Sequence, residues 1–398
     1  MPELKRNELP YFIALALYLV LAIGRTCIFS SFLQGPLFKG ILLVCLFFLV
    51  LKELYENEYS LKTVAVLVAF AAFALVVDRV SVLSSVASII FIFCGRNIDF
   101  RKTAKVALGV TLTCLILAVV CSKAGIIENY IFDPESDRPR EFLGFRYALF
   151  PSAYLLNAAM IMFYLKKGRP SFIWLAFIFV FNFYLYIKTD SRLSFLLCDA
   201  VILLSVVLKI VDSFERPKFI HSPVRKTLAW CSVFSFVIGT ALSLPMQIFF
   251  NGDVRWMAKA DSALGGRLSL GHESVRRFGF SLFGEDIPWV GNGLDINGNP
   301  VTDEYLYVDN LYLQFFQKYG VIFAILVLAL LTYTIWKAYK GKDYILMTCF
   351  VFLAVHALVD DLILYLNYNI FWVLLGTSLF TLGSSLRAGK VDTKIQGV

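Results

Sequence analysis

The sequence predicts an all-α, polytopic membrane protein with about twelve transmembrane helices. Two observations predict this fold class. The chain of 398 residues is 59% hydrophobic and only 17% charged, whereas soluble domains carry about 25% charged residues. Windows of about 20 apolar residues, the length that crosses a bilayer, also recur along the chain. They lie near residues 10–30, 36–52, 61–77, 80–95, 104–124, 146–165, 170–188, 192–211, 226–248, 309–336, 343–362 and 366–386.

The distribution of Lys and Arg predicts how these spans are oriented. Basic runs fall on one side of the predicted bundle together with both termini, and the positive side of a membrane protein faces the cytoplasm. The other side carries an acidic loop and one long polar segment, residues 249–308, between spans nine and ten. We therefore expect a single integral membrane domain over residues 1–398, with 249–308 as a large extracytoplasmic loop and both termini cytoplasmic. The basic runs are 96–102, 166–169, 216–226 and 337–342.

Several other classes of protein are not favoured by the sequence. The net charge of +8 could indicate a nucleic-acid partner, but the Lys and Arg residues lie in loops between spans, which membrane topology explains better. The eight cysteines fall in apolar stretches without metal-ligand spacing, so we expect neither disulfides nor a metal site. The sequence contains no Gly-rich phosphate loop and no dinucleotide-binding fingerprint. We expect no cofactor.

Three arginines depart from the positive-inside pattern and are candidate ligands for an anion. Arg79, Arg146 and Arg192 each fall at the outer end of a span that runs inward, where the helix N-terminus already carries positive potential. Arginines gathered at such ends would bind a phosphate or diphosphate. The alternative for each one alone is that it extends to lipid headgroups.

The long loop contains a predicted helix with two further candidates. Residues 266–278 place apolar side chains at nearly helical spacing, so one face of this helix should lie on the membrane surface or the bundle. Arg267 and His272 could then approach a lipid-linked substrate. For His272, the alternative is an ordinary solvated histidine.

Aspartates also gather on the outer side. Asp309 begins span ten, where it could act as a catalytic base or simply cap the helix. Asp360 and Asp361 fall at the outer end of span eleven, where they could orient the arginines or bind sugar hydroxyls.

Four short motifs occur in a characteristic order and on one side of the predicted membrane. They are Leu143-Gly144-Phe145-Arg146, Thr189-Asp190-Ser191-Arg192-Leu193-Ser194, Gly266-Arg267 to Leu282-Phe283-Gly284, and Asp309-Asn310-Leu311-Tyr312-Leu313 followed by Tyr319-Gly320-Val321. In these motifs and in the layout of its spans, the chain resembles the Wzy-type polysaccharide polymerases and O-antigen ligases.

The resemblance implies a bacterial glycosyltransferase of GT-C-like fold in the cytoplasmic membrane. Its substrates would be undecaprenyl-diphosphate-linked oligosaccharides at the outer face, and its partners membrane lipids, a chain-length regulator and a flippase. Arginines like Arg192 and Arg267 would hold the diphosphate, helped by Arg146 and Arg79. Tyr312, within the last motif, would help to bind or orient the sugar.

One departure from the family pattern favours a polymerase. The ligases carry a histidine at the position of Asp309. We therefore expect a metal-independent transfer in which Asp309, or else His272, accepts the proton of the attacking sugar hydroxyl. The alternatives are a ligase, which would move whole glycan to another acceptor, and a transporter or flippase of lipid-linked oligosaccharide. A transporter is not favoured, because the sequence does not divide into two similar halves.

Overall fold

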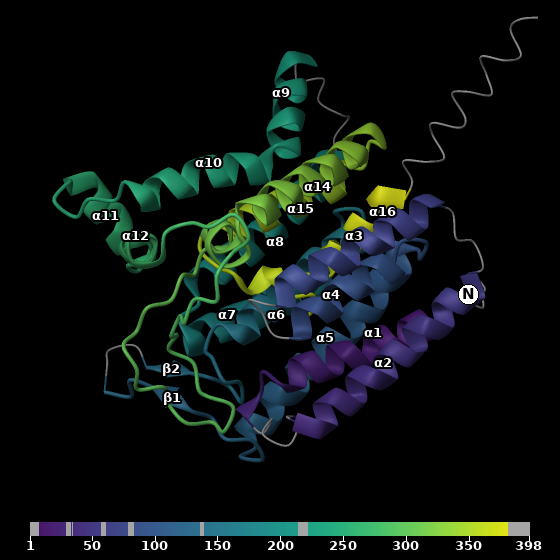
Figure 1. Cartoon of the computed structure of the whole chain (residues 1–398). Coiled ribbons are helices and arrows are strands. Elements are labelled where there is room, and N and C mark those ends of the chain that lie inside the picture. The colour runs from purple at the N-terminus through teal and green to yellow at the C-terminus, as the bar shows by residue number, and fades with distance from the viewer. Residues whose placement is uncertain are drawn as a thin grey trace, which may run out of the picture.

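The chain folds into a bundle of α-helices, which agrees with the all-α prediction (Figure 1). A computed structural model describes residues 8–28, 33, 35–56, 61–78, 83–135, 139–213 and 222–380. Helices account for 71% of the structure. The helices are α1 (Glu8–Gly24), α2 (Gly35–Glu56), α3 (Leu61–Asp78), α4 (Leu83–Cys94), α5 (Phe100–Lys123), α6 (Phe150–Leu165), α7 (Phe172–Thr189), α8 (Arg192–Ser213), α9 (Ser222–Val233), α10 (Ser235–Ile248), α11 (Arg255–Ala263), α12 (Arg267–Phe278), α13 (Leu311–Gln314), the π-helix η2 (Phe315–Tyr319), α14 (Val321–Lys340), α15 (Tyr344–His356), the 3₁₀ turns η3 (Leu362–Leu364) and η4 (Ile370–Trp372), and α16 (Val373–Phe380).

The helices pack as one continuous bundle. Helix α1 lies between α2 and α5, and α6 packs against α5, α7 and α8. Helices α14 and α15 join this group through α16, α9 and α6, while α10 to α12 project to one side (Figure 1). The core is built from aromatic and aliphatic side chains of almost every helix, and α6 is buried over most of its length. The candidate site lies at the end of this bundle where the loops gather.

The number of membrane spans differs from the prediction. Among the described residues, four helices are long and apolar enough to cross a membrane: α5, α7, α8 and α14. A fifth span results if α9 and α10, which are bent by 64° relative to each other, are taken as one broken span. Helices α1, α6 and α15 are apolar but shorter than 18 residues. The expectation of about twelve spans is therefore not supported by the described helices.

Helix breaks inside apolar runs account for part of the difference. The predicted span 309–336 is interrupted at Gly320, whose φ of 94° ends η2 before α14 begins. The predicted span 343–362 leaves the helix after His356. The described part of the predicted span 366–386 divides into η4 and α16. A hydropathy window registers apolar residues but not the turns between them.

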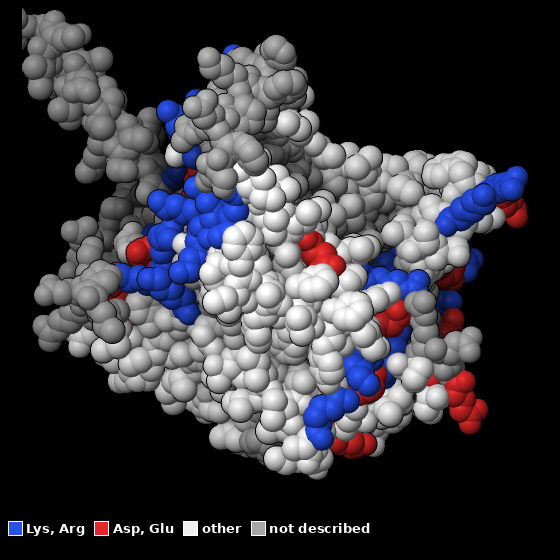
Figure 2. Space-filling model, turned by 180° about the vertical axis from the view of Figure 1, so that it is seen from behind, with Lys and Arg blue, Asp and Glu red and all other residues white. Residues whose placement is uncertain are grey.

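Charged side chains lie toward the ends of the bundle. Figure 2 shows a broad face that is almost without Lys, Arg, Asp and Glu between two charged regions. At the end where α1 and α5 begin, Lys102 pairs with Glu8 at 2.6 Å, and nearby Arg96 pairs with Glu53 at 2.6 Å. An uncharged belt between charged ends is the pattern of a protein that sits in a membrane.

The long loop contains the predicted helix. Helix α12 covers 267–278, and its face with Leu268, Gly271 and Ser274 is buried against the bundle. A Cβ on Gly271 would lie 1.9 Å from Oε1 of Gln247, so glycine permits α12 to approach α10 closely. Gln317 then bonds α12 to η2, because its amide nitrogen donates to the Ser274 carbonyl at 3.1 Å. The loop is thus packed onto the helices.

A two-stranded hairpin, β1 (Ile131–Phe132) and β2 (Arg140–Glu141), covers the end of the bundle where the loops gather (Figure 1). Glu141 anchors it by accepting hydrogen bonds from Lys188 of α7 and Asn129, both at 2.8 Å, and by pairing with Lys123 of α5.

Candidate active site

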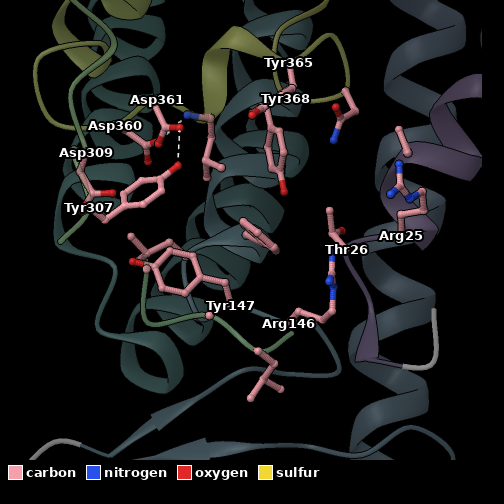
Figure 3. Close-up of a pocket in the computed structure, with 18 of the residues that line it drawn as sticks. Arg25, Thr26, Arg146, Tyr147, Tyr307, Asp309, Asp360, Asp361, Tyr365 and Tyr368 are labelled. Atoms are coloured by element: carbon pink, nitrogen blue, oxygen red, sulfur yellow. Dashed lines mark hydrogen bonds between the residues drawn. The ribbon is translucent and has the colours of Figure 1, made fainter. Parts of the chain in front are cut away.

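A polar cavity of about 370 Å³ opens at the loop end of the bundle (Figure 3). Five segments of the chain form its walls. They are the end of α1, the start of α2 with Phe38, the residues that lead into α6, the last part of the long loop, and the segment after α15. Arg146, Asp309, Asp360 and Asp361, all predicted as site residues, line it together. These four side chains therefore lie together at one end of the bundle.

Backbone pairing fixes the cationic wall of this cavity. The N–H of Arg146 donates to the carbonyl of Thr26 at 2.8 Å, just after α1. The carbonyl of Arg146 accepts from the N–H of Leu294 in the long loop, also at 2.8 Å. Gly144, with φ of 83°, provides the turn that lets these chain segments meet. Arg25 and Arg146 are therefore held beside each other by three chain segments.

The two arginines form a strongly cationic site. The Arg25 guanidinium lies 3.9 Å from the centroid of the Phe38 ring. Nε of Arg146 is buried and has no hydrogen-bond acceptor among the described residues. Burial lowers the pKa of Arg25, and the charge of Arg146 lowers it further. Two adjacent guanidinium groups at a cavity wall, one with an unused donor, favour binding of an anion.

Aspartates form the opposite wall (Figure 3). Asp309 pairs with Nη2 of Arg267 at 3.2 Å, and the hydroxyl of Tyr307 donates to Asp361 at 2.7 Å. Asp360 lies 3.4 Å from Nε2 of the buried His356. Burial raises the pKa of Asp309 to about 7, because desolvation of the carboxylate outweighs its attraction to Arg267. Burial and the neighbouring Asp360 also raise the pKa of Asp361.

Asn310, rather than Asp309, caps the following helix. Its side-chain oxygen accepts from the N–H of Leu313 at 2.9 Å, and its amide nitrogen donates to Ser243 at 2.7 Å. The capping alternative that the sequence left open for Asp309 therefore belongs to its neighbour. Asp309 contributes its carboxylate to the cavity.

Arg267 and His272, also predicted as site residues, lie outside the cavity wall. Arg267 donates to the carbonyls of Val359 and Leu264 in addition to its pair with Asp309. It therefore holds the Asp309 carboxylate in position without lining the cavity. Nδ1 of His272 lies 3.0 Å from the Gln247 carbonyl.

Tyr312 and Arg192 also lie outside the cavity wall. Tyr312 is fully buried, and its hydroxyl donates to the Ala354 carbonyl at 2.7 Å. The side chain of Arg192 is 64% exposed and pairs with Asp190 at 3.3 Å. Arg79 lies outside the described residues.

No protein-family model, curated protein or solved structure matches this chain. The resemblance described above therefore depends on the short sequence motifs alone.

Sequence reasoning missed Arg25 and the aromatic lining. Arg25 follows the C-terminal end of the first apolar helix and falls inside the predicted span 10–30, so the criterion that selected Arg146, an arginine at the outer N-terminus of a span, did not find it. The rings of Tyr154 and Tyr368 stack at 4.2 Å between centroids, and Tyr368 lines the cavity. Tyr147, Tyr305 and Tyr307 add further aromatic surface. Nothing in the spacing of these tyrosines marks them as neighbours.

The cavity can separate two charges during a reaction. A leaving anion would be stabilised at the Arg25–Arg146 wall, and a proton would be accepted at Asp309 on the other side. Aromatic rings between the walls suit the apolar faces of sugar rings. Among the described residues, no group of three or more His, Cys, Asp and Glu side chains has the arrangement of a metal site.

Proposed function

We propose that this protein is a polysaccharide polymerase of GT-C-like type that joins undecaprenyl-diphosphate-linked repeat units at the outer face of a bacterial cytoplasmic membrane. The observation that carries this proposal is the pairing, in one cavity, of an arginine wall with an aspartate whose pKa is raised to about 7. Both halves of a glycosyl transfer need such groups: the diphosphate leaves as an anion, and the attacking hydroxyl must lose a proton.

The diphosphate is assigned to Arg146 with Arg25. Arg146 has a buried nitrogen without an acceptor, whereas Arg267 is already engaged by Asp309 and two carbonyls, and Arg192 is paired with Asp190 at the surface. This assignment keeps Arg146 from the sequence-based set and adds Arg25. Arg267 then acts by positioning Asp309.

The proposed reaction is a single displacement at the anomeric carbon. A hydroxyl of the incoming repeat unit forms the new C–O bond and transfers its proton to Asp309. The bond between the anomeric carbon and the diphosphate oxygen breaks, and the electron pair leaves with the diphosphate toward Arg25 and Arg146. Placement of the two groups on opposite walls supports this direction of attack (Figure 3). Asp360 and Asp361 are placed to accept hydrogen bonds from sugar hydroxyls.

The proposal is tested with purified protein in lipid nanodiscs. The substrate is a lipid-diphosphate-linked oligosaccharide, with chelator present and no nucleotide sugar, and the products are separated on a gel. We expect a ladder that rises by whole repeat units and that forms much more slowly in the Arg146→Ala variant. Arg276→Ala changes an arginine whose side chain is 69% exposed and provides the matched control.

Other outcomes would contradict a polymerase. Transfer of one whole glycan to an added acceptor, without a ladder, would identify a ligase. Movement of intact lipid-linked oligosaccharide across vesicles, without new glycosidic bonds, would identify a transporter.

A further inference from the structure

A second candidate binding site lies at the break between α9 and α10, away from the polar cavity. The two helices meet at Phe234 with a bend of 64°. Irregular backbone at membrane depth is tolerated where it is buried in protein or lines a cavity. Here the break lines a groove of about 600 Å³ between the bent pair and α14. The bend therefore creates space that a straight helix would fill.

The groove is apolar, aromatic and open at its side. Trp230 and Phe234 of the bent pair face Ala329, Tyr333 and Trp336 of α14 across it. Trp230 is 45% and Phe234 is 41% exposed, so these large rings are not covered by the rest of the chain. Within a bilayer, such a surface is covered by a hydrocarbon chain or by another apolar helix.

Positive charge at one end of the groove selects between these occupants. Nζ of Lys340 lies 5.4 Å from the centroid of Trp336, which lines the groove. Lys226 is exposed one helical turn before Trp230. Contact between Trp230 and Tyr339, with centroids 6.0 Å apart, brings the second half of α9 against the end of α14. A phosphate at this end would be attracted by both lysines.

We propose that the groove binds one anionic phospholipid, with an acyl chain along the aromatic wall and the phosphate near Lys226 and Lys340. Both parts of the ligand have a complement in the groove: hydrocarbon for the rings, and negative charge for the lysines. A zwitterionic lipid supplies the chain without the net charge. A partner helix would supply apolar contacts alone.

Such a lipid would also hold the geometry of the bend. Helix α10 continues from the break to Gln247, whose carbonyl contacts His272 of α12. Arg267 begins α12 and pairs with Asp309. A lipid in the groove would therefore contact the start of α10, and α10 and α12 connect this point to Asp309. The lipid would make no contact with the cavity itself.

The experiment measures lipid binding directly and does not depend on the proposed function. Purified full-length protein is stripped of lipid in detergent, and native mass spectrometry follows its titration with phosphatidylglycerol and, separately, phosphatidylcholine. We expect tight binding of one phosphatidylglycerol. Because each lysine near an anionic lipid contributes about 1 kcal/mol, Lys226→Ala with Lys340→Ala should weaken it by about 30-fold.

A second variant and two controls keep the test specific. Ala329→Trp fills the groove and should abolish binding of both lipids, whereas Ala176→Trp adds the same side chain at an exposed position on α7 and should not. Lys105→Ala with Lys166→Ala removes two exposed lysines elsewhere and should leave binding unchanged.

Three results would overturn the proposal. Equal affinity for phosphatidylcholine would remove the role of charge. Unchanged binding in the lysine or Ala329→Trp variant would move the lipid to another surface. A photocrosslinker at Phe234 that captures a polypeptide in native membranes, and no lipid, would assign the groove to a partner helix.

Discussion

Replacing Asp309 by Asn is expected to abolish sugar transfer and to remove one component of the pH dependence of stability. Both effects have the same cause. Asp309 is 13% exposed, and burial raises its pKa from 3.8 to about 7 despite the guanidinium of Arg267 at 3.2 Å. Asn keeps the shape of the side chain and cannot accept the proton.

The magnitude follows from the shift in pKa. A rise of about 3 units, at about 1.36 kcal/mol per unit, corresponds to about 4 kcal/mol. The folded state binds the proton more tightly than the unfolded chain does. Asp309 therefore contributes stability that is fully present below about pH 4, falls as the pH rises, and is lost above about pH 7. Between pH 5 and pH 7 the loss amounts to about 2 kcal/mol.

Transfer should respond to pH in the opposite direction. Only the carboxylate can act as base, so the rate in the wild type should rise as the pH increases through about 7 and then level off. In the Asp309→Asn variant the rate should fall by about 100-fold or more. Thermal unfolding in detergent and gel-based transfer assays across this range measure the two effects on the same samples. Asp303→Asn, an exposed change in the same loop, is the control.

Two results would refute this reasoning. If the melting temperatures of wild type and Asp309→Asn change in parallel with pH, the pKa of Asp309 is not raised. If the variant transfers sugar at the wild-type rate, another group accepts the proton. His272 would then be the next residue to test.

Three further predictions concern other parts of the structure. Arg146→Ala should slow transfer by about 10- to 100-fold and Arg146→Lys by less, whereas Arg192→Ala should have a much smaller effect because its side chain is 64% exposed; polymer gels measure all three. Gly320→Ala should destabilise the fold by about 2 kcal/mol or more, because φ is 94° and the new Cβ would lie 2.3 Å from the nitrogen of Gly284; thermal unfolding at neutral pH checks this. Hydrogen bonds from the lysines that pair with Glu141 lower its pKa to about 2 although burial opposes them, so Glu141→Gln should cost about 1 kcal/mol at pH 7 and progressively less as the pH falls from about 4.5 toward 2.

The sequence predicted the features that depend on composition and local pattern. Its apolar content indicated helices, and the spacing of Leu268 and Gly271 indicated α12. Arg146, Asp309, Asp360 and Asp361 do meet in one cavity. They lie together because side chains at the same end of neighbouring apolar segments tend to meet there.

Features that depend on tertiary contacts were not predicted. The separation of Arg146 from Arg192 depends on Asp190, which adopts the left-handed conformation with φ of 50° and pairs with Arg192 at the surface. The division of the tenth predicted span depends on Gly320 meeting another backbone at close range. Neither contact produces a periodic pattern in the sequence, because each depends on the backbone conformation of a single residue.

The contact between Gly284 and Gly320 has a consequence for how the range of substrates could change. Residues 281–285 are joined to residues 317–322 by three backbone hydrogen bonds, including the bond from the Val321 N–H to the Ser281 carbonyl at 3.0 Å. The intervening chain is thus a closed loop with a fixed base, and its two ends stay in place whatever the length between them. Because lengthening a loop costs little free energy, the exposed tip around Asn297 can gain or lose residues while Asp309 keeps its position. Variation at this tip would reshape the entrance for a new sugar and leave the chemistry unchanged.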